Sequence, residues 1–284
     1  MKRVLNLFKL RIGVAIAFAA AAGMAVESGS GPGTGASLVL VLAVLVASAA
    51  AGAFNQYVER DLDARMGRTR SRPFVTGALR HAPGWLWLIG AMLAASVLAA
   101  AVAANALAAL YVFLGAFTYG VVYTVWLKRR TWWNIVVGGL AGSFAVLAGA
   151  AAVSSAPGPE ALALAVVLFL WTPPHFWSLA IACREDYAAA GVPMLPVVVG
   201  DARAARAIFA SAALLVAASL VPAAFGLGWI YFTFAAAGGL YFLFRCRDLV
   251  RRPGRASARA AFLASLAQLG AVLAGAMLDA ALLA

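Results

Sequence analysis

The 284-residue sequence contains few cysteines and few charged side chains. Its two cysteines, Cys183 and Cys246, provide neither a disulfide framework nor a metal-binding cysteine pattern, and we interpret them as small apolar side chains. Only 11% of the residues are charged, whereas 65% are hydrophobic, and the mean hydropathy is +0.94. This composition excludes an ordinary soluble domain and indicates an integral membrane protein.

Long polar segments are also missing. The longest are two loops at about 58–82 and 184–203, so we expect a single integral membrane domain over residues 1–284. Because the loops follow the second and sixth apolar runs, they suggest two related halves around a central cavity. No basic and aromatic pattern typical of a nucleic-acid module occurs, so we expect no nucleic-acid partner.

Apolar runs, by contrast, are abundant. A transmembrane helix needs roughly 20 mostly apolar residues, and on this basis the sequence predicts an all-α polytopic bundle of about nine spans. The expected spans are 10–27, 36–57, 83–103, 106–127, 134–153, 161–183, 204–225, 228–248 and 259–281.

The basic residues predict which loops face the cytoplasm, because Lys and Arg collect in short cytoplasmic loops. With nine spans and an inner N-terminus, all 22 basic residues fall on inner segments, namely 2–11 (including Lys2 and Arg3), 60–80, 128–130, 184–206 and 245–259. We therefore expect a multi-pass protein of the plasma (inner) membrane with cytoplasmic active-site loops and an external C-terminus. A basic inner face also suits anionic membrane lipids and anionic substrates.

The first apolar run, flanked by Lys9 and Arg11, shares features with a secretory signal peptide. Its helical pattern continues to Glu27 and no soluble domain follows, which favours a retained first helix. The charge distribution does not distinguish the two interpretations, because cleavage leaves the remaining topology unchanged.

The most polar stretch is NQYVERDLDARMGRTRSRP at 55–73. If the second span continues past its apolar part, Asn55, Glu59 and Asp63 lie at i, i+4 and i+8 on one helical face, while Asp61 points away. Oxygen donors of this kind suit Mg²⁺, which usually shares its coordination shell with waters and substrate phosphates. The spacing predicts half of a metal–diphosphate site at the inner membrane surface.

Arginines follow these acids, and their planar guanidinium groups bind phosphate oxygens in pairs. The alternative is that acids and arginines neutralise one another in a solvated loop. The one-face spacing at a helix end favours the site. The arginines are Arg65, Arg68, Arg70 and Arg72.

The second loop, REDYAAAGVPMLPVVVGD at 184–201, offers Glu185 and Asp186 at the inner end of the sixth span. Two acidic groups on one side of the membrane can share metal ions around one diphosphate. By itself this pair is a weak signal, because a Glu-Asp pair at a helix end is common.

The sixth span contains WTPPHFW at 171–177. Pro173 and Pro174 lack backbone donors, so we expect them to disturb the helix at membrane depth. His175 is an ionisable group inside the membrane and therefore a functional candidate. Three roles stay open for it: contact with a substrate, ligation of a haem iron, or a hydrogen bond to a neighbouring helix.

Between the fourth and fifth spans runs YTVWLKRRTWWN at 123–134. Lys128 and Arg129 either obey the inner-charge rule alone or also bind the anionic end of a substrate, with Tyr119 and Tyr123 one turn apart on the preceding helix. Three glycines of the fifth span favour close helix packing over ligand approach: Gly138, Gly139 and Gly142.

Together these motifs resemble the UbiA-type intramembrane prenyltransferases, in the form typical of the members that farnesylate haem. The pattern N-x-x-x-E-R-D-x-D-x-x-M-x-R-T-x-x-R-P at 55–73 is similar to the first Asp-rich motif of that family. Three further segments match in order: YTVWLKRRT at 123–131, LWTPPHFW at 170–177 and DYAAAGVPMLPVV at 186–198.

The resemblance implies a nine-helix bundle whose inner cavity binds farnesyl diphosphate through Mg²⁺ and transfers the farnesyl group to a vinyl group of haem B, giving haem O. A terminal oxidase or a haem-modifying enzyme is then a possible recipient of the product. The site residues it implies are the metal–diphosphate ligands Asn55, Glu59, Asp63 and Asp186, with Asp61 and Glu185 weaker, the phosphate contacts Arg68, Arg72, Lys128 and Arg129, and the haem-contact candidates His175 and Tyr123.

Three segments depart from the family pattern. FKLRIG at 8–13 lacks the proline expected between its basic residues, and GSFAVLAG at 142–149 lacks a proline pair that many relatives carry. The second acidic motif has no repeated D-x-x-x-D, which argues against a second metal held fully by protein.

Two rival functions are compatible with parts of this pattern. A UbiA-type enzyme acting on a quinone precursor or another aromatic acceptor usually has a richer second Asp motif and lacks the ordered PMLPVV and TPPHFW segments. A transporter or non-catalytic membrane subunit would also have buried acids and broken helices. It would not explain why the acidic face and the arginines follow one another at one membrane surface.

Overall fold

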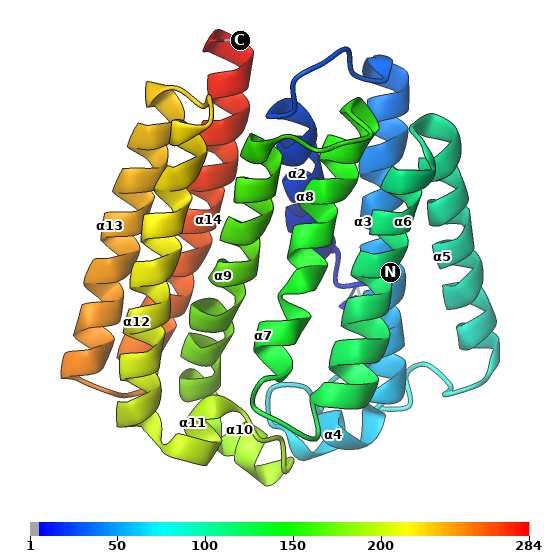
Figure 1. The fold of residues 1–284 in the computed structure, drawn as a ribbon. Coiled ribbons are helices and arrows are strands. Elements are labelled where there is room, and N and C mark those ends of the chain that lie inside the picture. Colours follow the sequence, from blue (N-terminus) through cyan, green and yellow to red (C-terminus); the bar gives the residue numbers. More distant parts are fainter. Residues whose placement is uncertain (1–5, 284) are drawn as a thin grey trace.

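The computed structural model describes residues 6–283, so the predicted inner-side residues Lys2 and Arg3 lie outside the described part. Over this range the chain is helical and contains no β-strand. The long helices stand side by side and roughly parallel (Figure 1). They are α2 (Leu10–Ala25), α3 (Gly33–Val58), α5 (Gly84–Ala103), α6 (Ala106–Phe117) with the π-helix η1 (Thr118–Leu127), α7 (Asn134–Gly138) with α8 (Leu140–Val153), α9 (Pro159–Ala182), α12 (Asp201–Leu220) with the 3₁₀-helix η2 (Val221–Ala224), α13 (Trp229–Arg251) and α14 (Arg255–Leu283).

Each of the nine predicted spans corresponds to a helix or to two consecutive helices. Eight are long and apolar enough to cross a membrane, while α2 has 16 residues and is shorter than the predicted span. Three short helices fill the predicted inner loops: α4 (Arg60–Arg65), α10 (Arg184–Ala189) and α11 (Leu195–Val199). They gather at the end of the bundle opposite the C-terminus, so both polar loops share one end (Figure 1).

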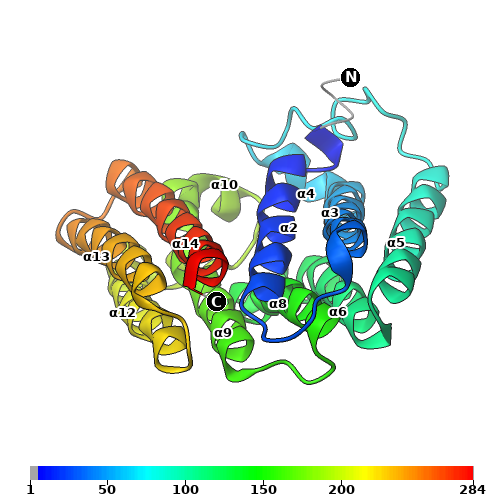
Figure 2. The same ribbon diagram turned by 90° about the horizontal axis from the view of Figure 1, so that it is seen from above.

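Seen along the bundle, α2 lies between α3 and α14 and packs against both of them and against α8 (Figure 2). Its crossing with α8 depends on glycines. A Cβ atom on Gly23 would lie 2.1 Å from the carbonyl oxygen of Val146, and one on Gly149 would lie 1.8 Å from that of Ala20. Small residues let transmembrane helices approach closely, and this crossing holds α2 against α8.

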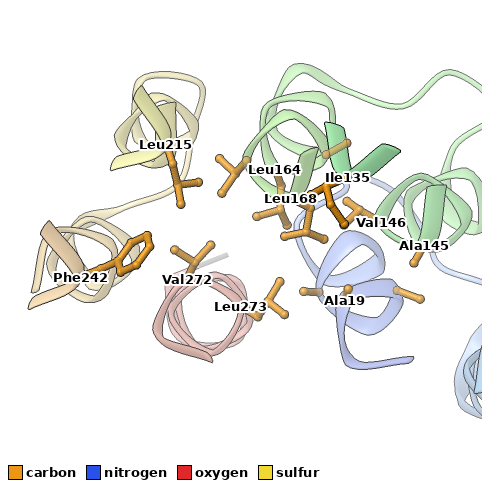
Figure 3. Packing of buried hydrophobic residues seen from close by; sticks show 14 of the residues in the cluster. Ala19, Ile135, Ala145, Val146, Leu164, Leu168, Leu215, Phe242, Val272 and Leu273 are labelled. Atoms are coloured by element: carbon orange, nitrogen blue, oxygen red, sulfur yellow. The ribbon is translucent and has the colours of Figure 1, made fainter. Parts of the chain in front are cut away.

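The apolar core on the other side joins α9, α12, α13 and α14. Figure 3 shows Leu164 and Leu168 of α9 facing α14, and Leu215, Phe242 and Val272 meeting between α12, α13 and α14. This packing holds α9 in place.

Two details differ from the predictions. The fifth span is divided at Gly139, where a Cβ atom would lie 3.1 Å from Thr172 Cβ and 3.2 Å from the carbonyl oxygen of Phe169, so the predicted close packing involves this glycine. The prediction that Pro173 and Pro174 disturb the helix is wrong, because α9 remains helical from Pro159 to Ala182. Pro173 has no amide hydrogen to donate to the Phe169 carbonyl, and Gly139 packs closely beside that carbonyl.

Candidate active site

The site begins where α3 passes into α4. Asn55, Glu59 and Asp63 are 2%, 1% and 2% exposed. Although the two helices are assigned separately, the Glu59 amide donates to the Asn55 carbonyl at 3.0 Å and the Asp63 amide to the Glu59 carbonyl at 2.8 Å. The i→i−4 hydrogen bonds therefore continue through the junction and keep the three side chains on one helical face.

Each of these three side chains is paired with a cation of the chain. The cations come from three separate elements. Lys9 Nζ donates to Asn55 Oδ1 at 2.6 Å, Lys128 Nζ donates to Glu59 Oε2 at 2.5 Å, and Arg72 Nη1 donates to both carboxylate oxygens of Asp63 at 2.8 and 2.6 Å.

The π-helix η1 brings its side chains to this face of α3. Thr124 Oγ1 accepts a hydrogen bond from Asn55 Nδ2 at 3.0 Å, and Lys128 reaches Glu59. The Lys128 amide bonds to the carbonyl of Tyr123, five residues earlier. In an α-helix, Tyr119 and Lys128 would be about 2.5 turns apart and on opposite sides. The wider turns of η1 place both beside the buried face, as π-helical segments often do at functional sites.

Two stacked tyrosines form one wall of the site. The rings of Tyr119 and Tyr123 lie 5.6 Å apart at 18°. The Tyr119 hydroxyl accepts a hydrogen bond from Lys9 Nζ at 3.0 Å, and Lys128 Nζ lies 5.6 Å from the centre of the Tyr123 ring. Aromatic faces stabilise nearby cations, so this wall suits a site rich in ammonium groups.

Asp61 and Arg129 pair away from the buried face. Arg129 donates two hydrogen bonds of 2.9 and 2.8 Å to Asp61, and the two side chains are 42% and 53% exposed. The hydrogen bond from Arg129 holds the pKa of Asp61 below its ordinary value. The prediction that Asp61 points away from the ligand face is in line with this geometry, whereas Arg129 lies with Asp61 rather than with the buried cluster.

The second acidic motif reaches the first loop. Asp186 accepts hydrogen bonds from the backbone amides of Gly67 at 2.8 Å and Arg68 at 3.4 Å, and Arg68 Nη2 donates to the Tyr187 hydroxyl at 3.3 Å. The two inner loops therefore meet, as predicted, and Asp186 orders the arginine loop through its backbone. Glu185 is exposed.

An apolar cavity of about 80 Å³ adjoins the buried cluster between α2, α3, α6 and α8. Lys9 and Tyr119 line its polar end. The other lining residues are almost all apolar or small, among them Ile12, Ile16, Val44, Ala47, Val112 and Ala145.

His175 lies in α9 in a separate buried cluster. Its ring stacks against Trp171 at 4.0 Å and Phe262 at 4.5 Å, and its Nδ1 lies 2.7 Å from Ser265 Oγ. Ser265 Oγ donates its proton to the Phe262 carbonyl at 2.6 Å, so Nδ1 is the donor to Ser265 and Nε2 carries the lone pair. The hydrogen bond to a neighbouring helix, one of the three roles considered, is thus present.

Residues 16–268 match the model of the UbiA prenyltransferase family. The chain is a UbiA-family prenyltransferase. Because the members of this family are prenyltransferases, the match excludes the rival interpretation of a transporter or a non-catalytic subunit.

Curated relatives of this UbiA-family chain are named protoheme IX farnesyltransferases. Protoheme IX farnesyltransferase 2 of Paramagnetospirillum magneticum is 56% identical over 281 residues, which cover 98% of this chain and 97% of the relative. Protoheme IX farnesyltransferase 1 of the same organism is 50% identical over 217 residues, 76% of each chain. The enzyme of Gloeobacter violaceus is 43% identical over 218 residues, 76% of this chain and 71% of the relative.

Solved structures share the UbiA fold at low identity. A structure concerning digeranylgeranylglyceryl phosphate synthase has a TM-score of 0.77 at 17% identity and covers 97% of this chain and 98% of its own. A UbiA homologue from Archaeoglobus fulgidus bound to DMAPP and Mg²⁺ has a TM-score of 0.76 at 18% identity, with 95% and 99% covered. These likenesses confirm the predicted fold class.

The donor set of this UbiA-family chain fits a divalent metal. Asn55, Glu59 and Asp63 offer the oxygen atoms that Mg²⁺ prefers, and Glu59 Oε1 is buried without a hydrogen-bond partner among residues 6–283. Within that range no three acidic, histidine or cysteine side chains converge on one metal position. A metal held here would complete its shell with waters and phosphate oxygens.

Sequence reasoning missed two residues of this site. The charge pattern of the sequence explains Lys9 by topology alone, although its ammonium contacts both Asn55 and Tyr119. Nothing in the sequence marks Thr124, although it fixes the Asn55 amide. The FKLRIG segment at the start of the first span was the available signal for Lys9. Thr124 had none, because its position depends on the π-helix.

Proposed function

We propose that this protein transfers the farnesyl group of farnesyl diphosphate to a vinyl group of haem B, forming haem O and diphosphate. The observation that carries the proposal is the buried face of α3, where oxygen donors and chain cations stand beside an apolar cavity. The names of relatives up to 56% identical over nearly the whole chain support this choice of donor and acceptor.

The reaction breaks the allylic C–O bond of farnesyl diphosphate, and the diphosphate leaves with the electron pair. The vinyl group of haem B attacks the allylic carbon, so a C–C bond forms and the positive charge passes to the carbon next to the haem ring. Water adds its oxygen there and loses a proton. The products are the hydroxyethylfarnesyl haem and diphosphate, and no oxidant is required.

The chain stabilises the departing diphosphate electrostatically. Arg72 and Lys128 lie at the buried face, and Arg68 lies on the loop that Asp186 contacts, which supports our proposal that all three bind phosphate oxygens. Asn55, Glu59 and Asp63 would hold Mg²⁺, which when bound would supply positive charge to the leaving group. We propose Arg129 as a peripheral phosphate contact, because its pairing with Asp61 is exposed and weak.

We propose that the cavity between α2, α3, α6 and α8 receives the farnesyl chain. Its polar end lies at Lys9 and Tyr119, and its apolar walls lead away from the charged cluster. An apolar wall keeps water from the allylic cation until the vinyl group attacks. Tyr123, stacked beside Tyr119, is proposed to bound the space where the haem acceptor enters.

His175 is proposed to contact the haem. Its ring is held by two aromatic neighbours and by Ser265, which leaves the Nε2 lone pair for a ligand. We further propose that the chain forms one domain and lies in the inner membrane. We also propose that the charged end of the bundle faces the cytoplasm, because the basic loops lie at that end. The product would pass to a haem-modifying enzyme or a terminal oxidase.

The test is incubation of the purified protein with farnesyl diphosphate, haem B and Mg²⁺, followed by mass spectrometry of the haem. We expect the mass of hydroxyethylfarnesyl haem, with formation that stops when Mg²⁺ is chelated. Unchanged haem together with a prenylated aromatic acid, such as a quinone precursor, would establish the rival acceptor class.

A paired variant tests the haem contact. His175→Ala should weaken haem binding, measured by the haem absorption spectrum, and leave binding of farnesyl diphosphate unchanged. His81→Ala is the matched control, because His81 is an exposed loop residue that stacks on Tyr57 of α3. Equal haem affinity in the His175 and His81 variants would remove His175 from the acceptor site.

A further inference from the structure

Lys9 has an unusual backbone conformation at the start of α2. Among residues 6–283 it is the only residue other than glycine with a positive φ, at 48° with ψ 41°. A lysine in the left-handed region is uncommon, and such residues cluster at functional sites. Its side chain runs beside Gly52, where a Cβ atom would lie 3.4 Å from Lys9 Cβ and 3.5 Å from Lys9 Cδ. The backbone turn and the glycine together direct the lysine inward.

The ammonium group lies among polar groups from two other elements. Lys9 Nζ donates to Asn55 Oδ1 at 2.6 Å and to the Tyr119 hydroxyl at 3.0 Å, and it lies 5.6 Å from the centre of the Tyr119 ring. Lys9 also lines the polar end of the apolar cavity. It therefore touches both the metal-ligand face and the space proposed for the prenyl chain.

Asn55 is the one uncharged member of the proposed ligand face. Its Nδ2 donates to Thr124, so its Oδ1 is the atom left for a metal, and Lys9 occupies that oxygen. A metal ion and an ammonium group cannot both use the oxygen at close range, because two cations a few ångströms apart repel each other. Binding of the metal must move Lys9.

We propose that Lys9 is a resident cation of the diphosphate site: it holds Asn55 before loading and transfers to the diphosphate when the metal takes the Asn55 oxygen. The lysine stem is flexible and its ammonium has three donors, so a short movement exchanges an amide oxygen for phosphate oxygens. The exchange makes metal and diphosphate bind together, because the lysine gives up Asn55 at low cost only when phosphate is present.

This inference rests on the proposed function for its diphosphate, and its test needs no haem. Mn²⁺ serves as the metal probe, with binding followed by the loss of the free Mn²⁺ electron paramagnetic resonance signal. Affinity for farnesyl thiodiphosphate, an unreactive analogue, is measured at saturating Mn²⁺. The variant is Lys9→Met, which has similar length and no charge. Arg11→Met is the control, because Arg11 is an exposed cation two residues away.

We expect Lys9→Met to bind Mn²⁺ about tenfold more tightly than the wild type without diphosphate, because a competing cation is gone. The same variant should bind the analogue about tenfold more weakly, because a charge-assisted contact is lost. Arg11→Met should change neither value. Lys9→Arg should keep the weak Mn²⁺ affinity of the wild type, since it keeps the charge.

Unchanged or weaker Mn²⁺ binding in Lys9→Met would overturn the resident-cation role, and unchanged analogue binding would overturn the transfer. Tight Mn²⁺ binding by Lys9→Arg would show that charge is not the cause. If Lys9→Met does not fold, Lys9→Gln tests the same loss of charge. Failure of the proposed function would appear elsewhere, as unmodified haem in the wild-type reaction.

Discussion

Lys128 donates a hydrogen bond of 2.5 Å to Glu59 where the π-helix meets the end of α3. The two side chains are 11% and 1% exposed, so the pair is buried at the polar end of the bundle. Loss of one partner from a buried pair leaves an uncompensated charge and costs about 3–5 kcal/mol, more than the pair itself contributes.

This pair gives a first prediction on stability. Lys128→Met should lower the free energy of unfolding more than the double variant Glu59→Gln with Lys128→Met, because the single variant strands the Glu59 carboxylate. Thermal unfolding in detergent, measured for both variants and for Glu59→Gln alone, checks the order. A double variant less stable than Lys128→Met would show that Glu59 finds another partner.

The ligand face predicts different effects for neighbouring acids. Asp63→Ala and Arg72→Ala should each reduce turnover about 10²–10³-fold, because Asp63 would hold the metal and Arg72 would contact the leaving diphosphate. Asp61→Asn should retain most activity, since Asp61 is exposed and paired with Arg129 outside the buried face. Haem farnesylation rates, with membrane insertion checked for each variant, distinguish the three. Near-normal turnover in Asp63→Ala would remove Asp63 from the site.

The Thr124 hydroxyl orients Asn55. It donates to the Tyr119 carbonyl at 2.8 Å and accepts from Asn55 Nδ2, which points Asn55 Oδ1 toward the cluster. Thr124→Val should therefore weaken Mn²⁺ binding in the presence of farnesyl thiodiphosphate by about 10–100-fold, as for other residues that orient metal ligands. Thr124→Ser should restore it. Equal loss in both variants would point to packing rather than the hydroxyl.

The glycine crossing of α2 and α8 predicts a stability effect far from the charged residues. Gly149→Ala should destabilise the fold by about 1–3 kcal/mol or more, because its new methyl group would meet the Ala20 carbonyl. Gly90→Ala is the control, since no atom outside its own helix lies within 4 Å of an added Cβ. Thermal unfolding of the two variants compares them directly. Similar midpoints would mean that α2 and α8 separate without cost.

Sequence alone predicted the helices well, because each span is a long apolar run bounded by polar loops. The fourth span, expected at 106–127, matches Ala106–Leu127. Its π-helical half was not predictable, since an almost uniformly apolar segment shows no periodicity that distinguishes two kinds of helix. The division at Gly139 and the crossing at Gly23 depend in the same way on tertiary neighbours.

Within the site, the ligand face was predictable because Asn55, Glu59 and Asp63 share one helix and their spacing fixes their relation. Their partners were harder to predict. Lys9 and Lys128 are distant in sequence, and a lysine at a membrane edge has the same pattern whether it obeys topology or serves a site. Arg129, next to Lys128, contacts Asp61 instead of the buried face. Only the course of η1 determines which of the two cations reaches Glu59.

The pairing of the ligand face also sets its charge before any substrate arrives. Glu59 and Asp63 balance two of the three cations Lys9, Lys128 and Arg72, which leaves one net positive charge. A prenyl diphosphate carries about three negative charges near neutral pH. With one Mg²⁺ it brings a single net negative charge, which balances the net positive charge of these five side chains. A second Mg²⁺ would leave uncompensated charge at the membrane edge, which is costly. We therefore expect one metal ion per bound diphosphate, measurable as bound Mn²⁺ per chain in the complex with farnesyl thiodiphosphate.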